Sequence, residues 1–329
     1  MNDRKLIYKI LLVSAAVFVS LLQISCDRFR EDLPECRLLV RFKYDYNMLS
    51  VDAFHEKVKK VDLYVFDEDG KFLFVQSAQG PPLASGDYRM ELDVPVGRYK
   101  LMAWAGAGGD DSYDAAKLVA GQSSIEEAKL KLKRETSLVV DREIDALWYG
   151  EVLDIHYTGT KYQTETINLI KDTNKIRFAF IGNNMARLNL EDYTYEIIGA
   201  NGYLGHDNAL LPDDVLSYRP YYSEQRNASS VLVEMNTMRL IGRGDMRFVV
   251  TSTSTGKPVL DFNLVDYLVL TKMEGHPWGE QEYLDRQDEY AIVMIFSQCG
   301  KDADEYWLAM QITINDWTWH FQHENGDPF

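Results

Sequence analysis

Short runs of alternating apolar and polar residues fill most of this chain, and this period of two restricts its fold more than any other feature. From Leu38 to Tyr44 every second residue is apolar. Successive side chains of a strand point to opposite faces, so the pattern predicts a strand with one buried face. Similar runs recur as far as residues 259–270 and 307–319, and only 278–287 looks clearly helical. We therefore predict an all-β protein of antiparallel sandwiches with a few short helices.

A β-hairpin is predicted at residues 61–75. Apolar residues alternate on both sides of the turn 67–70, which ends in Asp69 and Gly70. An Asp-Gly pair between two alternating runs is a strong hairpin signal, because glycine accepts a positive φ without steric cost.

The first 26 residues have the layout of a bacterial export signal. Arg4, Lys5 and Lys9 precede an apolar run from Ile10 to Leu22, and small residues lead to Cys26. A positive start, a short apolar run and a small residue at the cut are typical of a secretory signal. The alternative is a transmembrane anchor, but a bilayer core needs about 20 apolar residues and this run has 13.

Cys26 directly after the expected cut predicts lipid attachment, because bacterial lipoproteins are acylated on such a cysteine. Ile24 and Ser25 fit a lipobox, whereas Gln23 stands where the usual motif has leucine. No eukaryotic lipidation motif is present at either end of the sequence. Residues 27–35 then read as a polar tether.

The length of the mature chain favours two domains. The pattern of strands pauses near residue 160, and we place the domain boundary there. The predicted division is a lipoprotein signal peptide at 1–25, a lipidated tether at 26–36, an N-terminal β-sandwich domain at 37–160 and a C-terminal β-sandwich domain at 161–329.

The charge balance excludes several kinds of partner. The first 25 residues hold three of the 35 Lys and Arg residues and one of the 51 Asp and Glu residues, which leaves the mature chain at a net charge of −18. Nucleic acid requires a basic surface, and so does adsorption to anionic lipid. We expect no nucleic-acid partner, and membrane attachment should come through acyl chains.

The sequence offers no motif for enzyme chemistry. It contains neither His-Glu-x-x-His nor Gly-x-Ser-x-Gly nor Cys-x-x-Cys, and His320 and His323 have a spacing that places them on opposite faces of a strand. We expect no catalytic, cofactor or metal site and no small-molecule substrate. Whether Cys36 and Cys299 form a disulfide stays open at this point.

Several passages resemble the FimB-type fimbrial anchor family, the fimbrillin-A associated anchor proteins. The similarity is dense over roughly residues 22–105. It is carried by these segments: Cys26-Asp27, Glu31 to Cys36, Phe42 to Met48, Val61 to Asp67, Gly70 to Phe72, and Leu92 to Gly97 leading to Ala103-Trp104.

The resemblance implies a fold and a role. Family members are outer-membrane lipoproteins with two tandem transthyretin-like β-sandwich domains and no enzymatic activity. They hold the base of a donor-strand-type fimbrium to the cell surface and limit its length. Cys26 is then the lipid site, with palmitate among its acyl chains, and fimbrial stalk subunits are the partners.

The partner is expected to bind by β-strand addition to a free sheet edge. The segments 37–46 and 307–321 are the two candidate edges. Two alternative functions remain, a fimbrial tip adhesin and a surface lipoprotein that binds glycans through some of its six Trp and 20 Tyr residues.

Overall fold

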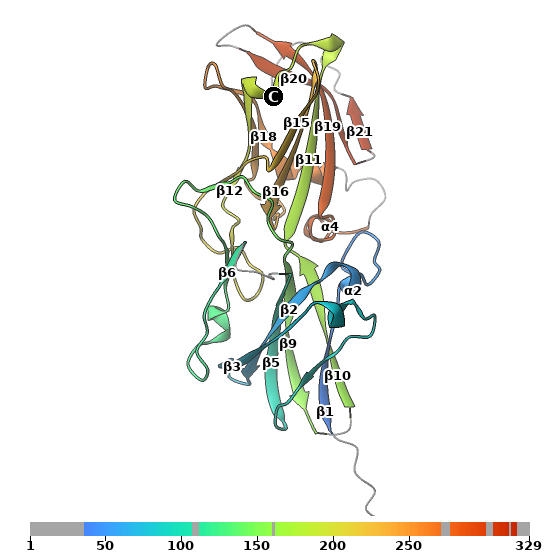
Figure 1. Cartoon of the computed structure of the whole chain (residues 1–329), viewed down its shortest axis with the longest axis vertical. Coiled ribbons are helices and arrows are strands. Elements are labelled where there is room, and N and C mark those ends of the chain that lie inside the picture. Colours follow the sequence, from blue (N-terminus) through green and yellow to red (C-terminus); the bar gives the residue numbers. More distant parts are fainter. Residues whose placement is uncertain are drawn as a thin grey trace, which may run out of the picture.

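The computed structural model describes residues 36–106, 112–159, 162–270, 277–300, 305–315 and 317–320. Strands dominate these residues, in two lobes stacked along one long axis (Figure 1). The predicted all-β fold class is confirmed. The signal peptide, Cys26 and the tether up to residue 35 lie outside the described residues.

Seven strands form the lower lobe in Figure 1, in the order β3-β2-β5-β9-β10-β1-β4. Their bounds are β1 Arg37–Lys43, β2 Lys60–Asp67, β3 Phe72–Gln79, β4 Met90–Leu92, β5 Gly97–Ala105, β9 Trp148–Tyr157 and β10 Tyr162–Lys171. The predicted hairpin is the β2–β3 pair. In β1 buried residues alternate strictly with less buried ones, as its sequence predicts, and Leu38, Val40 and Phe42 enter the lower core.

Both faces of the β2–β5 pair are buried. One face packs against β1 and β4, and the other carries Tyr64, Phe66, Met102 and Trp104 into a second core. Residues 112–140 contribute to this second core with the short strands β6 Tyr113–Ala115, β7 Leu130–Leu132 and β8 Val139–Val140. A face that would otherwise meet solvent is therefore covered by the chain itself.

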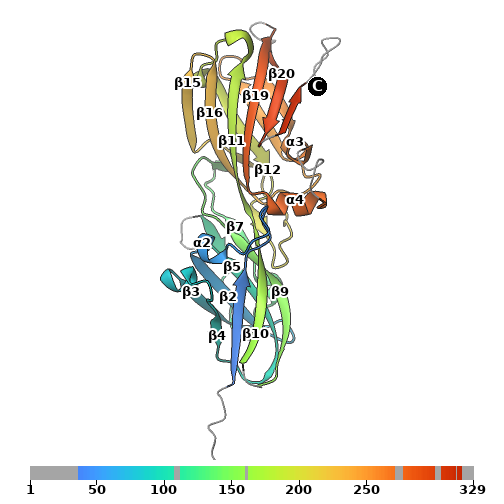
Figure 2. The ribbon, with the colours of Figure 1, turned by 90° about the vertical axis from the view of Figure 1, so that its right-hand side faces the viewer.

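The upper lobe is a sandwich of two sheets with the orders β15-β16-β11-β19-β20-β21 and β18-β17-β12-β14-β8. The bounds of its strands are β11 Thr173–Gly182, β12 Tyr193–Gly199, β14 Leu216–Tyr218, β15 Tyr222–Asn227, β16 Ser230–Met238, β17 Arg247–Ser252, β18 Pro258–Asn263, β19 Glu289–Cys299, β20 Tyr306–Ile314 and β21 Trp317–His320. Figure 2 shows the six-stranded sheet face on. Stacked rings fill the space between the sheets, with Phe178 and Phe248 at 4.1 Å between centroids and Phe296 and Trp307 at 4.0 Å.

Strands from the two halves of the chain pair with one another. β8 pairs with β14, and β7 pairs with β13 (Tyr203–Leu204). β10 follows residue 160 in sequence but lies in the lower lobe between β9 and β1. We propose that the domain boundary falls after Lys171 rather than near residue 160, because a cut at 160 would divide one sheet.

Most strand pairs are antiparallel, as predicted, but β1–β10, β11–β19 and β8–β14 are parallel. Parallel neighbours need a long crossover between them. Here the crossovers are whole excursions of the chain, which a local alternating pattern does not reveal.

Helices are short, and one replaces a predicted strand. They are α2 Phe54–Lys57, α3 Leu264–Leu270 and α4 Glu280–Arg286, with the 3₁₀ turns η1 Pro81–Ala84, η2 Ile125–Glu127, η3 Asn183–Met185 and η4 Leu190–Asp192. The run 259–270, expected as one strand, is β18 followed by α3. Asn263 Oδ1 accepts hydrogen bonds from the backbone N–H groups of Val265 and Asp266, which satisfies the first turn of a helix.

Candidate functional sites at the sheet edges and the lobe junction

The described chain begins at Cys36, at the lower end of the lower lobe, where β1 starts (Figure 1). The Cys36 thiol is exposed and lies 2.5 Å from the Gly159 carbonyl oxygen. Cys299 ends β19 in the upper lobe and is also a free thiol. The two cysteines are therefore not bridged, and the predicted lipid site Cys26 would precede the lower end of the molecule by ten residues.

The expectation that residues 37–46 form a free edge is wrong. β1 lies between β10 and β4, and all seven of its residues pair with β10. On the other side Leu38, Leu39 and Val40 pair with β4. An interior strand has no continuous row of free backbone groups to offer a partner.

The segment predicted at 307–321 does include a sheet edge. β20 pairs with β19 along its length, and β21 is the outermost strand. The described part of β21, Trp317–His320, pairs with the stretch Gln311–Ile314 of β20. Within the described residues, the outer side of β20 from Tyr306 to Met310 has no strand partner, whereas Phe321 lies outside them.

Other edges carry features that discourage strand addition. β15 is mostly exposed, contains Glu224 and Arg226, and has a bulge between Gln225 and Asn227. The Gln225 side chain also bonds the backbone of the neighbouring Leu190. β18 begins with Pro258 and pairs with β17 through a bulge. Charges, bulges and proline all protect natural edges, so among the described residues β20–β21 is less protected than β15 or β18.

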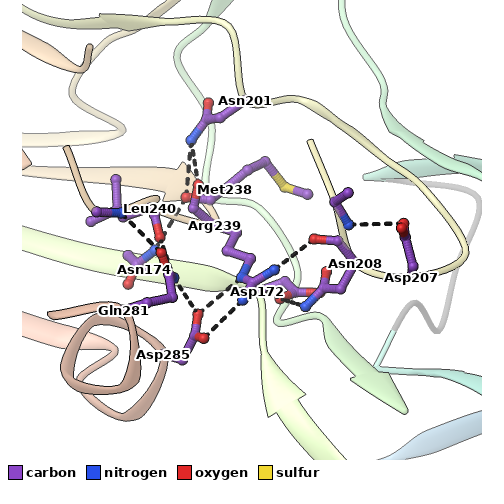
Figure 3. Close-up of polar contacts among 12 residues, drawn as sticks. Asp172, Asn174, Asn201, Asp207, Asn208, Met238, Arg239, Leu240, Gln281 and Asp285 are labelled. Atoms are coloured by element: carbon purple, nitrogen blue, oxygen red, sulfur yellow. Dashed lines mark hydrogen bonds and ion pairs between the residues drawn. The ribbon is translucent and has the colours of Figure 1, made fainter. Parts of the chain in front are cut away.

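A buried polar cluster lies where the two lobes join (Figure 3). Asp172 is the single residue between β10 and β11, and its side chain is fully buried. Asn208 Nδ2 donates to Asp172 Oδ1 at 2.9 Å, and Arg239 Nε lies 3.9 Å from the same oxygen. Arg239 also holds both carboxylate oxygens of Asp285 on α4, at 2.9 and 2.8 Å. One guanidinium thus joins the linker residue to a helix of the upper lobe.

Burial dominates the electrostatics of Asp172. The pKa of its carboxyl is raised to about 7, mainly by desolvation. Arg239 and the Asn208 hydrogen bond lower this pKa and Asp285 raises it, but these effects are smaller than that of burial. Water cannot reach the carboxylate, and one cation is shared between two acids. Asp172 Oδ2 is buried without a hydrogen-bond partner among the described residues.

A second set of contacts joins α4 to the loop after β1. The Arg286 guanidinium lies between two rings, 4.1 Å from the centroid of Tyr46 and 4.7 Å from that of Trp278. It also donates to the carbonyl oxygens of Asp45 and Asn47 at 3.4 and 3.3 Å. The contacts of Arg286 with residues 45–47 join parts of the chain that are about 240 residues apart in sequence, and they oppose bending at the junction.

These clusters bind the lobes to each other rather than forming a reaction centre. The described residues contain no group of three or more His, Cys, Asp or Glu side chains that could hold a metal ion. Among the same residues no helix has the length and apolar character needed to cross a membrane. The sequence did not single out the junction residues. In the sequence, residues 172–174 indicate only a turn between two alternating runs, 164–171 and 176–180.

Comparison with known proteins gives the family. The model of the family described as fimbrillin-A associated anchor proteins Mfa1 and Mfa2 matches residues 33–323. The minor fimbrium anchoring subunit Mfa2 of Porphyromonas gingivalis is 21% identical over 305 residues, and the match covers 90% of each chain.

Solved structures share the architecture over most of the chain. A candidate polysaccharide-binding protein of Bacteroides thetaiotaomicron is 51% identical with a TM-score of 0.82, and the match covers 88% of this chain and 100% of that one. A candidate adhesin of Bacteroides ovatus is 31% identical with a TM-score of 0.77, covering 90% and 98%. The anchor protein Mfa2 of P. gingivalis has a TM-score of 0.70 at 19% identity, covering 86% and 98%, and shows the same fold.

The named relatives are fimbrial anchors, a candidate adhesin and a candidate polysaccharide-binding protein rather than enzymes, in agreement with the sequence. Both the family match and the structural matches extend through the two lobes. This protein belongs to the family of fimbrillin-A associated anchor proteins.

Proposed function

We propose that this protein is an outer-membrane lipoprotein that holds the base of a fimbrium to the cell surface and limits the length of that fimbrium. The observation that carries the proposal is the family match over residues 33–323, directly behind an export signal that ends in Cys26. Acyl chains on Cys26 would hold one end of the molecule, and the lobes would hold the fimbrium.

A stalk subunit would bind by adding a strand to the molecule. Main-chain hydrogen bonds to a free edge provide affinity, and alternate side chains provide specificity. The outer side of β20 at Tyr306–Met310, which has no strand partner among the described residues, is the edge that we propose for this contact. It lies in the lobe farther from Cys36, the first described residue after the proposed lipid site (Figure 1).

The lipid anchor is tested by replacing its cysteine. We expect the Cys26→Ala variant to be absent from the outer-membrane fraction, because no acyl chain can then be attached. Cys36→Ala is the matched control, since it removes the other cysteine near the tether and should leave the protein in that fraction. Mass spectrometry of the N-terminal peptide should show acyl chains in the control only. Retention of Cys26→Ala in the outer membrane would refute lipid anchoring.

Saccharide binding is a second candidate function. The Bacteroides thetaiotaomicron structure at 51% identity is described as a candidate polysaccharide-binding protein, and a relative at 31% identity is described as a candidate adhesin. An anchor at the cell surface can also bind glycans, so the two functions are compatible. Selective retention of the mature protein on immobilised glycans supports this function, and uniform absence of binding argues against it.

A further inference from the structure

A cavity of about 560 Å³ opens at the junction of the two lobes. Its walls come from β5, β9 and β10 of the lower lobe, from η2, from the loop 206–208 and from Arg239. Ligand sites occur preferentially at domain junctions and have volumes of roughly 300–1,000 Å³. The cavity adjoins the polar cluster of Figure 3, with which it shares Asn208 and Arg239.

Two polar groups in the cavity wall have unused hydrogen-bonding capacity. Asn208 is 2% exposed, and its Oδ1 has no hydrogen-bond partner among the described residues. The Tyr149 hydroxyl accepts a bond from the Val152 N–H at 3.3 Å, and none of the described residues accepts its proton. A ligand that accepts from Tyr149 would satisfy its hydroxyl, and a hydroxyl group can do so. Asn208 Oδ1 is itself buried, so a ligand in the cavity does not reach it.

The charges around the cavity argue against an ionic ligand. Both wall cations are already paired, Lys100 with Asp154 and Arg239 with Asp285. The wall carboxylates are Glu126, Glu151 and Asp207. These carboxylates would repel an anion. A simple cation offers no acceptor for the Tyr149 proton. The polar groups therefore favour a neutral ligand with several hydroxyls.

The rest of the wall is apolar. Ile125, Val152 and Ile170 contribute aliphatic surface, on which the C–H face of a sugar ring can pack while its hydroxyls reach the polar side. We propose that the junction cavity binds a neutral saccharide of one or two rings, with the Tyr149 hydroxyl as its polar contact. This proposal rests on saccharide binding, the second proposed function, and is independent of fimbrial anchoring.

The test is titration of the mature protein with a panel of neutral sugars (glucose, galactose, mannose, N-acetylglucosamine and disaccharides of these), followed by saturation-transfer NMR and calorimetry. For the sugar that binds, Tyr149→Phe should weaken binding about tenfold, the effect of one lost hydrogen bond. Val152→Trp should abolish binding because the indole fills the cavity.

The control variants make the same chemical changes elsewhere. Tyr195→Phe removes a buried hydroxyl in the upper lobe, and Val75→Trp adds an indole on the exposed strand β3. Both should bind sugar as the wild type does, and thermal unfolding should show all four variants folded.

The possible outcomes test the cavity as the binding site separately from saccharide binding as a function. Binding that survives Tyr149→Phe and Val152→Trp would place the saccharide elsewhere, which overturns the cavity but keeps saccharide binding. Absence of binding to every sugar of the panel overturns the cavity proposal. If the protein is retained on immobilised glycans although no sugar of the panel binds, longer saccharides bind at another surface. Fimbrial anchoring is measured separately and does not depend on these results.

Discussion

At the scale of single residues, Asp172 is the most informative side chain of the junction. Its pKa of about 7 in the folded state lies well above its ordinary value of 3.8. The folded state therefore binds this proton more tightly than the unfolded state does. Stability should fall as the pH rises from about 4 to about 7, and the loss should level off above that range.

Asp172→Asn removes this dependence, because an amide stays neutral and can still accept the Asn208 hydrogen bond. We expect the variant to exceed the wild type in free energy of unfolding by about 2–4 kcal/mol above pH 7, and the gap should shrink toward pH 4. Urea unfolding across this pH range measures the difference. Asp154→Asn, at an exposed carboxylate, serves as control and should follow the wild-type profile. A variant that is less stable at pH 8 would contradict the buried-charge explanation.

Arg286 is the second residue on which the junction depends. Arg286→Ala removes two cation–π contacts and the bonds to the loop after β1, and we expect a loss of about 1–3 kcal/mol in unfolding free energy. Arg286→Lys should recover only part of it, because an ammonium lacks the flat guanidinium that lies between two rings. Arg226→Ala, at an exposed ion pair on β15, should cost less than about 1 kcal/mol. Equal effects at positions 226 and 286 would remove the case for Arg286 as a junction clamp.

At the scale of elements, local pattern predicted the strands well and their partners poorly. The alternation in β1 and the Asp69-Gly70 turn correspond to the observed strand and hairpin. The sequence around Asp172 reads equally as a tight hairpin, but β10 and β11 belong to different sheets. Which strands meet depends on contacts far apart in the chain, as in the parallel β1–β10 pair, and no local window of sequence contains that information.

The helix α3 shows the same limit and provides a prediction. Its apolar sequence fits a strand or a buried helix, and the Asn263 cap decides for the helix. Asn263→Ala should lower the unfolding free energy by about 1 kcal/mol. Asn263→Asp should recover only part of this loss, because a carboxylate also caps the helix but cannot donate the bond that Asn263 Nδ2 makes to the Gly244 carbonyl oxygen. Urea unfolding of the three proteins decides the matter. An alanine variant with wild-type stability would show that packing alone holds α3.

The candidate sites divide in the same way. Lipidation of Cys26 stays a prediction, which the sequence alone can make because a lipidation signal is local. The edge at β20 was partly predictable, because the segment 307–321 includes it. The cavity was not predictable, since Tyr149 and Asn208 meet only after two lobes have packed. The interior position of β1 was missed because β4, which covers it, is only three residues long.

At the scale of the whole molecule, the two lobes form one elongated body, with Cys36 at the end of the lower lobe (Figure 2). One residue links β10 to β11, and buried ion pairs and ring contacts reinforce the join. Strands from the first half also complete sheets of the second. Such a body is suited to transmit a pull from a fimbrium to a lipid anchor without opening between its lobes.

The most direct test of anchoring measures where fimbriae remain. A strain that lacks this protein is complemented with the wild type, with Cys26→Ala or with Cys36→Ala, and the fimbrial stalk subunit is quantified on cells and in the medium. Anchoring through the lipid predicts that stalk subunit stays on cells with the wild type and Cys36→Ala, and is released into the medium with Cys26→Ala. Equal retention of fimbriae in all strains, the deletion included, would contradict the anchor function.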